Sequence, residues 1–417
     1  MSLTLKTAAK AVEVALKGKL VPIMKGAPGV GKSDTINRIA KEMNLEVIDM
    51  RLSQCDPTDL MGLPMIQGGV AGYQPLDTFP LVGRDFLPFI DEEANKFAKL
   101  INQARYSKDA MSFIKPEIED AYGNDAADIL ETIAVTALDD DQLKDIIAKI
   151  GLDTAQRAGW LLFLDELPNA DVAVQQAAYK LVLDRMVASY ALRPEVHIVA
   201  AGNREEDNCY VQPMPAALKT RLVHLDIQLS ADEWLDWAIE SGKVDPRVSA
   251  FIMHDKSQLN KDTTDTTDIT FACPRTWEYI SRIVEQYKSF PTDKEMSEAN
   301  MLRQLIYGTV GESAGIQFWN FTKYFGEIPS FDEIVKNPEK ARLVSGGHLF
   351  AVAATLMSNT TFDTLESVIK YVDRMDEKEV QFLIVRGLLT ANKHDSKFRS
   401  HQSILKWLKD LSTYMKK

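Results

Sequence analysis

The feature that most constrains this chain is a run of five apolar residues, Trp160-Leu-Leu-Phe-Leu164, that ends at two adjacent acids, Asp165 and Glu166. A strand with one face in water alternates apolar and polar side chains, because successive side chains point to opposite faces. A continuous apolar run instead fits a strand that is covered on both faces, as in a parallel sheet. Ligands of open α/β sheets bind just beyond the carboxyl ends of such strands, so we predict that the two acids face a ligand.

A glycine-rich stretch far upstream indicates what that ligand is. Residues 26–33 read GAPGVGKS, after the apolar segment 21–24 and before a helical pattern over residues 34–43. This is the G-x-x-x-x-G-K-[ST] loop between a strand and a helix, where backbone N–H groups and the helix N-terminus cradle phosphates. We predict that Lys32 reaches the β- and γ-phosphates of ATP, and that the Ser33 hydroxyl ligates Mg²⁺.

The loop gives each acid a predicted role. Asp165 is expected to hold Mg²⁺, and Glu166 to polarise the water that attacks the γ-phosphate, since a buried strand fixes both positions. A third strand end reads Val199-Ala-Ala-Gly-Asn203. Asn203 could orient the attacking water beside Glu166, although taken alone it is equally an ordinary turn residue after a glycine.

The spacing of these segments predicts the fold. Apolar strands at 21–24, 45–49, 160–164, 196–200 and 222–227, with helical patterns between them, indicate βαβ units and a parallel sheet of about five strands. After residue 229 the sequence changes to long helical patterns. We therefore predict an α/β fold with an αβα core over residues 1–228, followed by an all-helical lid and C-terminal domain over residues 229–417.

Residues 84–156 interrupt the predicted core. This stretch is helical in pattern and carries 16 Asp or Glu against 8 Lys or Arg, a net charge of −8 out of −12 for the whole chain. Its apolar spacing indicates folded helices and excludes a disordered acidic tail. We expect an insertion that either is decorative, stabilises contacts between subunits, or docks a basic partner.

Composition excludes several classes of protein. No apolar run approaches the roughly 18–20 residues that span a bilayer, and the N-terminal stretch reads as an amphipathic helix without a signal-peptide core. Three widely spaced cysteines suggest neither a disulfide framework nor a zinc site. We expect a cytoplasmic protein without a membrane partner. The net charge of −12 argues against wrapping a long nucleic acid.

Five motifs together resemble the AAA+ ATPases of the MoxR and dynein-related group: GAPGVGKS, LLFLDE, AAGN, PAALKTRL and PRTW. The resemblance covers about residues 10–80 and 158–330. The wider sequence around the motifs most closely resembles the MoxR-like ATPases of bacteria and phages. It implies that Asn203 is sensor 1, Arg221 an arginine finger acting on a neighbouring subunit, and Arg275 sensor 2. The chain departs from the family at Leu167-Pro-Asn and in the insertion at 84–156.

The resemblance implies a ring ATPase, which we expect to be a hexamer, that hydrolyses Mg-ATP to remodel or activate a protein partner. A von Willebrand factor A-domain protein is the partner class that it implies. The alternatives are a nucleic-acid motor or nuclease-associated ATPase, and a nucleotide switch without mechanical work. A basic, aromatic pore loop would favour the motor. The candidate hairpin at 65–74 has no Lys or Arg.

The predicted site residues fall into three sets. The catalytic residues are Glu166, Asn203 and Arg221. The metal ligands are Ser33 and Asp165. The nucleotide-binding residues are Gly26, Ala27, Pro28, Gly29, Val30, Gly31, Lys32, Ser33, Asp34, Asp165 and Arg275.

One further motif is expected to be a coincidence. Residues 392–395 read NKHD and fit the N-K-x-D pattern by which GTPases recognise guanine. They follow a helical pattern, far outside the predicted nucleotide domain, whereas guanine recognition needs the motif beside the phosphate loop. We do not expect this segment to bind nucleotide.

Overall fold

The computed structural model describes residues 2–67, 70–104, 110–124, 126, 138–204, 212–261, 269–287, 291, 296–392 and 395–407. The chain forms two compact units. The first comprises residues 1–27 and 32–228, and the second comprises residues 229–417 together with the short stretch 28–31. The helices and strands of the first unit are α1 (Leu5–Lys17), β1 (Val21–Lys25), α2 (Lys32–Glu42), β2 (Leu45–Arg51), α3 (Pro57–Met61), β3 (Leu63–Gln67), β4 (Val70–Gln74), α4 (Glu92–Ala104), α5 (Ala110–Tyr122), α7 (Asp140–Lys149), β5 (Gly159–Asp165), α8 (Val172–Asp184), β6 (Met186–Val187), β7 (Tyr190–Ala191), β8 (Val196–Gly202), α9 (Ala216–Lys219) and β9 (Leu222–Asp226).

A parallel sheet is the centre of the first unit. Within the described residues it has five strands in the order β2-β5-β8-β1-β9, and every pair in it is parallel. The carboxyl ends of all its strands therefore lie at the same edge. β8 lies between β1, which leads into the glycine-rich loop, and β5, which ends at the two acids. Residues far apart in the sequence are consequently neighbours at that edge.

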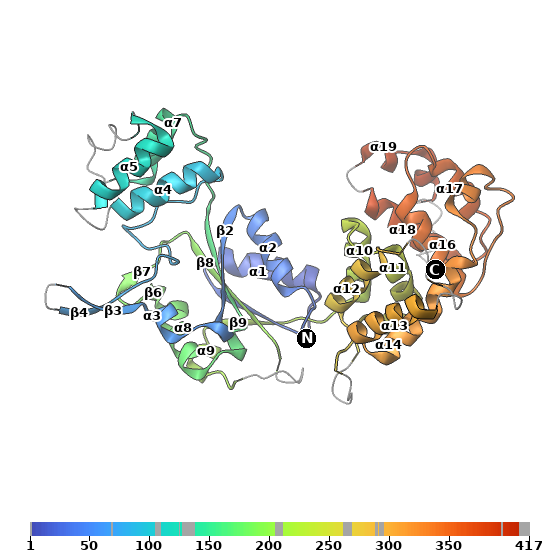
Figure 1. Ribbon diagram of the computed structural model, residues 1–417, viewed down its shortest axis with the longest axis horizontal. Coiled ribbons are helices and arrows are strands. Elements are labelled where there is room, and N and C mark those ends of the chain that lie inside the picture. The colour runs from blue at the N-terminus through green and yellow to red at the C-terminus, as the bar shows by residue number, and fades with distance from the viewer. Residues whose placement is uncertain are drawn as a thin grey trace. The chain divides into compact units, whose positions relative to one another are not determined.

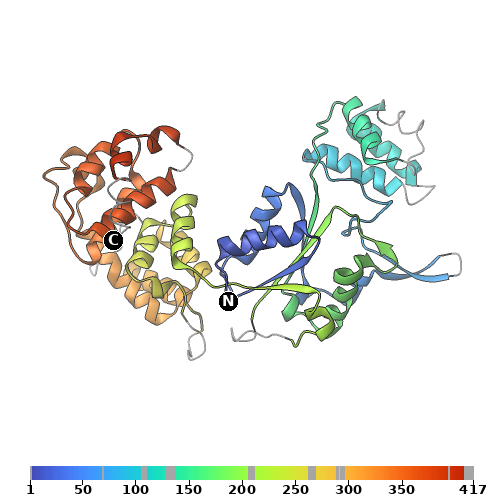
Figure 2. The same cartoon turned by 180° about the vertical axis from the view of Figure 1, so that it is seen from behind.

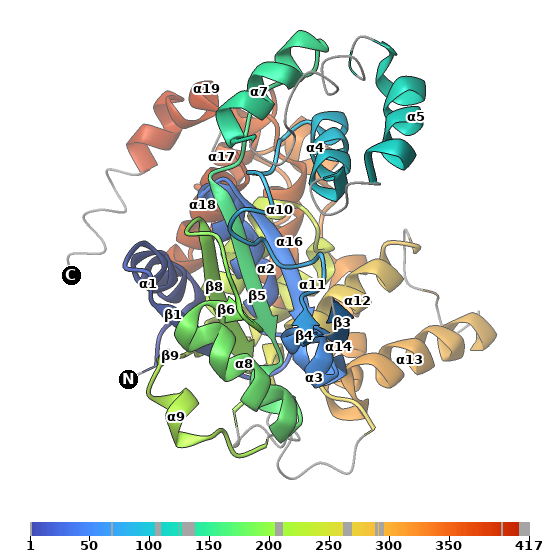
Figure 3. The same ribbon diagram turned by 90° about the vertical axis from the view of Figure 1, so that its left-hand side faces the viewer.

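Helices cover both faces of the sheet. Figures 1 and 3 show α1 and α2 on one face and α8 on the other. Leu161 and Phe163 of β5 pack with α1 and α2, whereas Leu162 and Leu164 pack with α8. The apolar run is continuous because both faces of its strand are buried. The predicted fold class, an αβα core with a parallel sheet followed by a helical region, is confirmed.

A two-stranded hairpin follows the second strand. β3 pairs antiparallel with β4, from Leu63 opposite Gln74 to Gln67 opposite Val70. Figure 2 shows it extending away from the parallel sheet. Ile66 is 76% exposed and Tyr73 51% exposed. The hairpin therefore presents apolar side chains to the surroundings, and its strands contain no charged residue.

The insertion has a hydrophobic core of its own. α4, α5 and α7 lie together beyond one end of the sheet (Figure 1), and their buried side chains form one cluster that includes Phe97, Ile118 and Ile147. Arg193, which precedes β8, ties this subdomain to the core: its Nη2 lies 2.7 Å from Asp140 Oδ2 at the start of α7. Residues 105–109, 125 and 127–137 lie outside the described part of the insertion.

The described residues of the second unit form helices joined by loops, and they contain no strand. Its α-helices are α10 (Ala231–Ser241), α11 (Pro246–His254), α12 (Pro274–Val284), α13 (Met296–Val310), α14 (Glu312–Thr322), α15 (Phe331–Lys336), α16 (Gly347–Asn359), α17 (Leu365–Val372), α18 (Lys378–Ala391) and α19 (Ser396–Arg399). They share one large apolar core, at whose centre Phe251, Trp277 and Phe318 contact one another. No helix in the described ranges of the chain is long and apolar enough to span a membrane.

Candidate functional site

The glycine-rich loop connects β1 to α2 at the carboxyl edge of the sheet. Gly29 has a φ of 73° and Gly31 a φ of 95°, in the left-handed region that glycine adopts without steric strain. Gly26 N–H donates to the carbonyl of Gly202 at the end of β8, at 3.3 Å. The loop is thus anchored to the neighbouring strand, and the N-terminus of α2 opens directly from it.

Lys32 is held against the loop by three oxygen atoms. Its Nζ donates to the carbonyl oxygens of Gly26 at 2.7 Å and Ala27 at 3.1 Å, and to Oδ1 of Asn203 at 3.2 Å. Asn203 stands just beyond β8, which borders β1, so the sheet order brings it to the loop. The structure therefore places the predicted sensor residue beside the predicted phosphate-binding lysine.

Ser33 and Asp165 meet on the other side of the loop. Ser33 Oγ donates to Asp165 Oδ2 at 3.3 Å. Burial raises the pKa of Asp165, and the nearby carboxylates of Asp49 and Glu166 raise it further, against hydrogen bonds from Glu166 N–H and Ser33 that lower it. The surrounding negative charge thus disfavours ionisation of Asp165. A bound cation would offset this charge and favour the ionised carboxylate.

The oxygens of Ser33 and Asp165 fit Mg²⁺. This ion is typically held by one or two protein oxygens, with phosphate oxygens and water completing its coordination. Throughout the described residues, no group of three or more His, Cys, Asp or Glu side chains is arranged as a metal site. Two protein oxygens would leave the other coordination positions of the ion to phosphate oxygens and water.

Glu166 occupies an unusual backbone conformation. Its φ of 58° and ψ of 29° lie in the left-handed region, which is uncommon for a residue with a side chain. Its N–H donates to Asp165 Oδ1 at 2.9 Å. The turn that follows is pressed against β8, because a Cβ at Gly202 would lie 2.2 Å from Pro168 Cδ. The left-handed turn directs the chain sharply away from the strand at the second acid.

Ser53 is a site residue that the sequence did not reveal. It lies in a 3-10 turn, η1 (Leu52–Gln54), directly after β2, and its Oγ donates to Oε2 of Glu166. No motif marks this serine, because a single polar residue after a strand has no distinctive pattern. Only the adjacency of β2 and β5 in the sheet brings it to the acid.

Among the described residues, no recorded hydrogen bond or ion pair joins Asp34 or Arg221 to Lys32, Ser33 or the two acids. Asp34 is exposed in the first turn of α2, where a negative charge is favourable. Arg221 is exposed after α9, where its guanidinium donates to Thr220 Oγ1 at 2.9 Å and lies 5.7 Å from the Tyr179 ring centroid. Arg275 is exposed in the first turn of α12, in the second unit. Their roles stay predictions.

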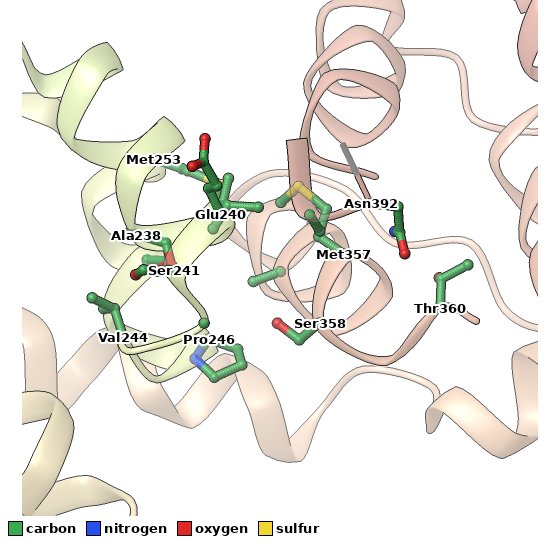
Figure 4. A pocket seen from close by; sticks show the side chains of 15 residues that line it. Ala238, Glu240, Ser241, Val244, Pro246, Met253, Met357, Ser358, Thr360 and Asn392 are labelled. Carbon is green, nitrogen blue, oxygen red and sulfur yellow. The ribbon is translucent and has the colours of Figure 1, made fainter. Parts of the chain in front are cut away.

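A separate pocket lies within the second unit. It has a volume of about 380 Å³ and opens where α10, α16 and α18 end, between Ser241, Ser358 and Asn392 (Figure 4). Asn392 begins the NKHD segment, and its Nδ2 donates to the carbonyl of Leu388 at 3.0 Å, so it caps α18. Lys393 and His394 lie outside the described residues. The pocket contains none of the predicted nucleotide-binding residues.

No protein-family model and no curated protein matches this chain. Among solved structures, it is similar to a protein of Cytophaga hutchinsonii described as a candidate ATPase, at 13% identity over 76% of each chain with a TM-score of 0.32. It is similar to a point mutant of RuvB from Thermotoga maritima at 12% identity, over 98% of this chain and 90% of that chain, with a TM-score of 0.28.

The replication initiator DnaA, bound to AMPPCP and single-stranded DNA, shows 10% identity over 98% of this chain and 96% of its own, with a TM-score of 0.31. TM-scores this low support no statement about what this chain binds or does. The fold and the candidate site therefore stand on the sheet order and on the contacts at its carboxyl edge.

Proposed function

We propose that this chain is an AAA+ ATPase that binds and hydrolyses Mg-ATP. The observation that supports this is one cluster at the carboxyl edge of the sheet. There Lys32 contacts Asn203 at 3.2 Å, and Ser33 contacts Asp165 at 3.3 Å, with Glu166 next in the chain. A loop lysine, a hydroxyl, a half-buried carboxylate and a second acid are the groups that phosphoryl transfer to water requires.

Each residue has a distinct part in the proposed reaction. The loop amides and the Lys32 ammonium neutralise the phosphate oxygens as charge develops on them in the transition state. Ser33 and Asp165 would hold Mg²⁺, which would supply positive charge to the phosphate oxygens. Glu166 accepts a hydrogen bond from the attacking water and polarises it. Asn203, already beside Lys32, orients that water or the γ-phosphate by its amide.

Within this class we favour a MoxR-like ring, with a hexamer as its expected form, that remodels or activates a protein partner. The motifs support the subgroup, and the hairpin β3–β4 supports a protein substrate. Ile66 and Tyr73 are exposed on a hairpin whose strands have no Lys or Arg, so it offers apolar contact without phosphate-binding charge. A von Willebrand factor A-domain protein is the partner class proposed; a nucleic-acid motor is the competing function.

Two variants test the ATPase. Lys32→Ala is expected to lose nucleotide binding, measured by calorimetry with a non-hydrolysable ATP analogue and Mg²⁺. Glu166→Gln is expected to bind normally yet turn over at least ~100-fold more slowly, the typical contribution of a positioned base. Lys41→Ala, an exposed lysine in the last turn of α2, is the matched control and should behave as wild type. Equal loss of binding in both site variants would overturn the roles.

The Glu166→Gln variant also separates the two functions. Because it holds ATP without turnover, it should trap whatever the ring acts upon. Capture from a lysate with ATP, with and without nuclease, is expected to retain the same protein partner in both samples. Release of all captured material by nuclease, together with ATPase stimulation by DNA or RNA, would support the nucleic-acid motor instead.

A further inference from the structure

The outermost strand of the sheet has an open edge. β2 stands at the end of the sheet order and pairs only with β5 within the described residues. A strand in this position presents backbone N–H and C=O groups on its free side, which can pair with another chain. Apart from the ladder to β5, no recorded hydrogen bond involves a backbone group of Glu46, Val47 or Ile48.

A cavity runs along this open edge. It has a volume of about 590 Å³, and Glu46, Val47 and Ile48 of β2 form one side of it. Helix α4 of the insertion forms the opposite side, through residues that include Asn95, Lys99, Asn102 and Gln103. In Figure 3, α4 lies beside the amino-terminal part of β2. The cavity is thus a groove bordered by a free strand, by helix α4 and by residues of the segment 74–88, which connects the hairpin to the insertion.

The helical wall carries side-chain amides. Asn95 and Asn102 are seven residues apart and so face the same side of α4, with Gln103 beside them. Asn102 Nδ2 donates to Asp85 Oδ1 at 3.4 Å. Its Oδ1 is buried and has no hydrogen-bond donor among the described residues. A buried carbonyl oxygen without a donor is unfavourable, so it marks a position where a ligand N–H would be accepted.

The charged residues that line the cavity are of both signs, with no excess of one sign large enough to select a strongly charged ligand: Glu46, Asp77 and Asp85 are acidic, and Arg84 and Lys99 are basic. Arg84 Nε lies 2.6 Å from Asp85 Oδ2, and Arg157 Nε lies 2.6 Å from Glu46 Oε2. A strongly charged ligand such as a nucleotide would therefore find no unpaired charge of opposite sign at these positions. Amide side chains, by contrast, donate and accept hydrogen bonds as peptide groups do. This chemistry matches an uncharged polypeptide backbone.

We propose that an extended, uncharged segment of a partner polypeptide binds in this groove as an added strand on β2. Its backbone pairs with the open edge at residues 46–48, and one of its N–H groups donates to Asn102 Oδ1. Side chains on one face of the segment contact the apolar part of the lining, which includes Phe86, Ala98 and Trp160. Backbone pairing supplies affinity, and these alternate side-chain contacts supply selectivity.

The site does not depend on the proposed ATPase activity. It lies along the amino-terminal half of β2, whereas Ser53 and the phosphate loop lie at the carboxyl edge. The binding test can therefore be run with the Lys32→Ala variant as well as with wild type. Equal peptide binding by both would show that a failed ATPase assignment leaves this inference standing.

A displayed library of linear seven-residue peptides, panned against the full chain, provides the probe. Enriched peptides are expected to bind wild type and to lose about tenfold in affinity with Asn102→Ala, the typical effect of removing a buried hydrogen-bond acceptor. Gln103→Trp, an exposed position on the groove wall, should block binding. Lys96→Ala is the matched control: Lys96 lies on the same helix but does not line the cavity, and the variant should stay within about twofold of wild type, since an exposed charge contributes little.

Two measurements establish the mode of binding. Backbone N-methylation of an enriched peptide should weaken binding at alternate residues, because an added strand directs every second N–H toward its neighbour, and at one further residue, whose N–H donates to Asn102 Oδ1. Hydrogen exchange at residues 46–48 should slow when the peptide is added. The proposal is overturned if no peptide is enriched, if Gln103→Trp binds the enriched peptides as wild type does, or if N-methylation shows no alternation. Circular dichroism melts of each variant exclude unfolding as the cause of a loss.

Discussion

The hydroxyl of Ser53 donates a hydrogen bond to Oε2 of Glu166, across 113 residues of sequence. Ser53 follows β2 and Glu166 follows β5, and these strands are neighbours from Leu45 opposite Gly159 to Arg51 opposite Asp165. The bond occupies one of the two oxygens of the carboxylate that we propose to polarise the attacking water. Under that proposal, Ser53 competes with the water for this carboxylate.

Removing this hydroxyl is expected to increase turnover. Ser53→Ala should raise the basal kcat for ATP hydrolysis roughly three- to tenfold, the equivalent of about 0.7–1.4 kcal/mol. The KM for ATP should not change, because Ser53 contacts no residue of the phosphate loop in the recorded hydrogen bonds. Steady-state phosphate release measures both quantities. Ser53→Thr keeps the hydroxyl and is the control; a fall in kcat with Ser53→Ala would mean that the serine positions Glu166 productively.

Gly202 has no room for a side chain. Gly202→Ala would place a Cβ 2.2 Å from Pro168 Cδ, so β8 and the turn after Glu166 would have to separate. Overpacking of this kind typically costs about 1–3 kcal/mol. We expect a loss of at least ~2 kcal/mol in the free energy of unfolding, measured by urea denaturation, and reduced ATP hydrolysis. Gly72→Ala is the control, since a Cβ there meets nothing within 4 Å. Equal stability of the two variants would contradict the close contact.

Arg221 is predicted to act on a neighbouring subunit. It is exposed, and its recorded contacts, with Ala217, Thr220 and Tyr179, leave the guanidinium at the surface. An arginine supplied in trans can contribute ~10³–10⁵ in rate. Mixing inactive Arg221→Ala with inactive Lys32→Ala subunits should therefore restore some hydrolysis, because mixed interfaces contain one intact site. Absence of activity at every mixing ratio, while both variants still assemble, would exclude the trans role.

The insertion is expected to be separable from the ATPase core. Its buried cluster contains only residues between 86 and 147, so replacing residues 86–155 by a short Gly-Ser linker leaves the two clusters on the sheet almost intact. Arg193 loses Asp140 but keeps Glu195, at 3.0 Å. Basal ATPase activity and assembly should persist, with a modest fall in Tm.

Partner capture should be lost in the same variant if the acids of the insertion dock a basic partner. Capture by the full chain should then weaken as salt rises, because screening reduces attraction between exposed charges. Pull-downs at two salt concentrations measure both effects. A deletion variant that retains every wild-type partner at low salt would contradict the docking role.

His197 gives the stability of the first unit a predictable pH dependence. Burial lowers the pKa of His197, and the positive charges of Lys19 and Arg185 lower it further, although a hydrogen bond to the Leu16 carbonyl opposes them. The unfolded chain therefore binds a proton on this residue that the folded chain does not, as pH falls through about 6.5. Stability is full above that pH and declines below it, toward the folded pKa.

Replacement of the imidazole should remove part of this slope. His197→Asn keeps a side-chain donor near the Leu16 carbonyl but cannot take up a proton. Its free energy of unfolding, measured by urea denaturation between pH 5 and 8, should change less with pH than that of wild type. An unchanged slope would show that other groups carry the acid sensitivity.

Local sequence was sufficient to predict the strands, the glycine-rich loop and the position of the two acids, because each of these features depends on residues that are neighbours in the chain. The apolar runs of β1, β5 and β8 identify strands, since burial on both faces favours continuous apolar side chains; the edge strands β2 and β9 are partly exposed and mix apolar with polar residues. Gly29 and Gly31 identify the loop, since its turn requires φ values that other residues rarely adopt. The helical character of residues after 229 is likewise a local pattern, and the observed fold agrees with it.

Tertiary structure alone decided which polar groups meet. Ser53 contacts Glu166, Asn203 contacts Lys32, and Arg193 contacts Asp140 because of the order β2-β5-β8-β1-β9 and the packing of the insertion on it. A serine or an asparagine after a strand is common, and nothing local distinguishes the one that reaches a distant partner. Strand order depends on the packing of many apolar side chains across the whole sheet, so the site it assembles is not encoded in any one segment.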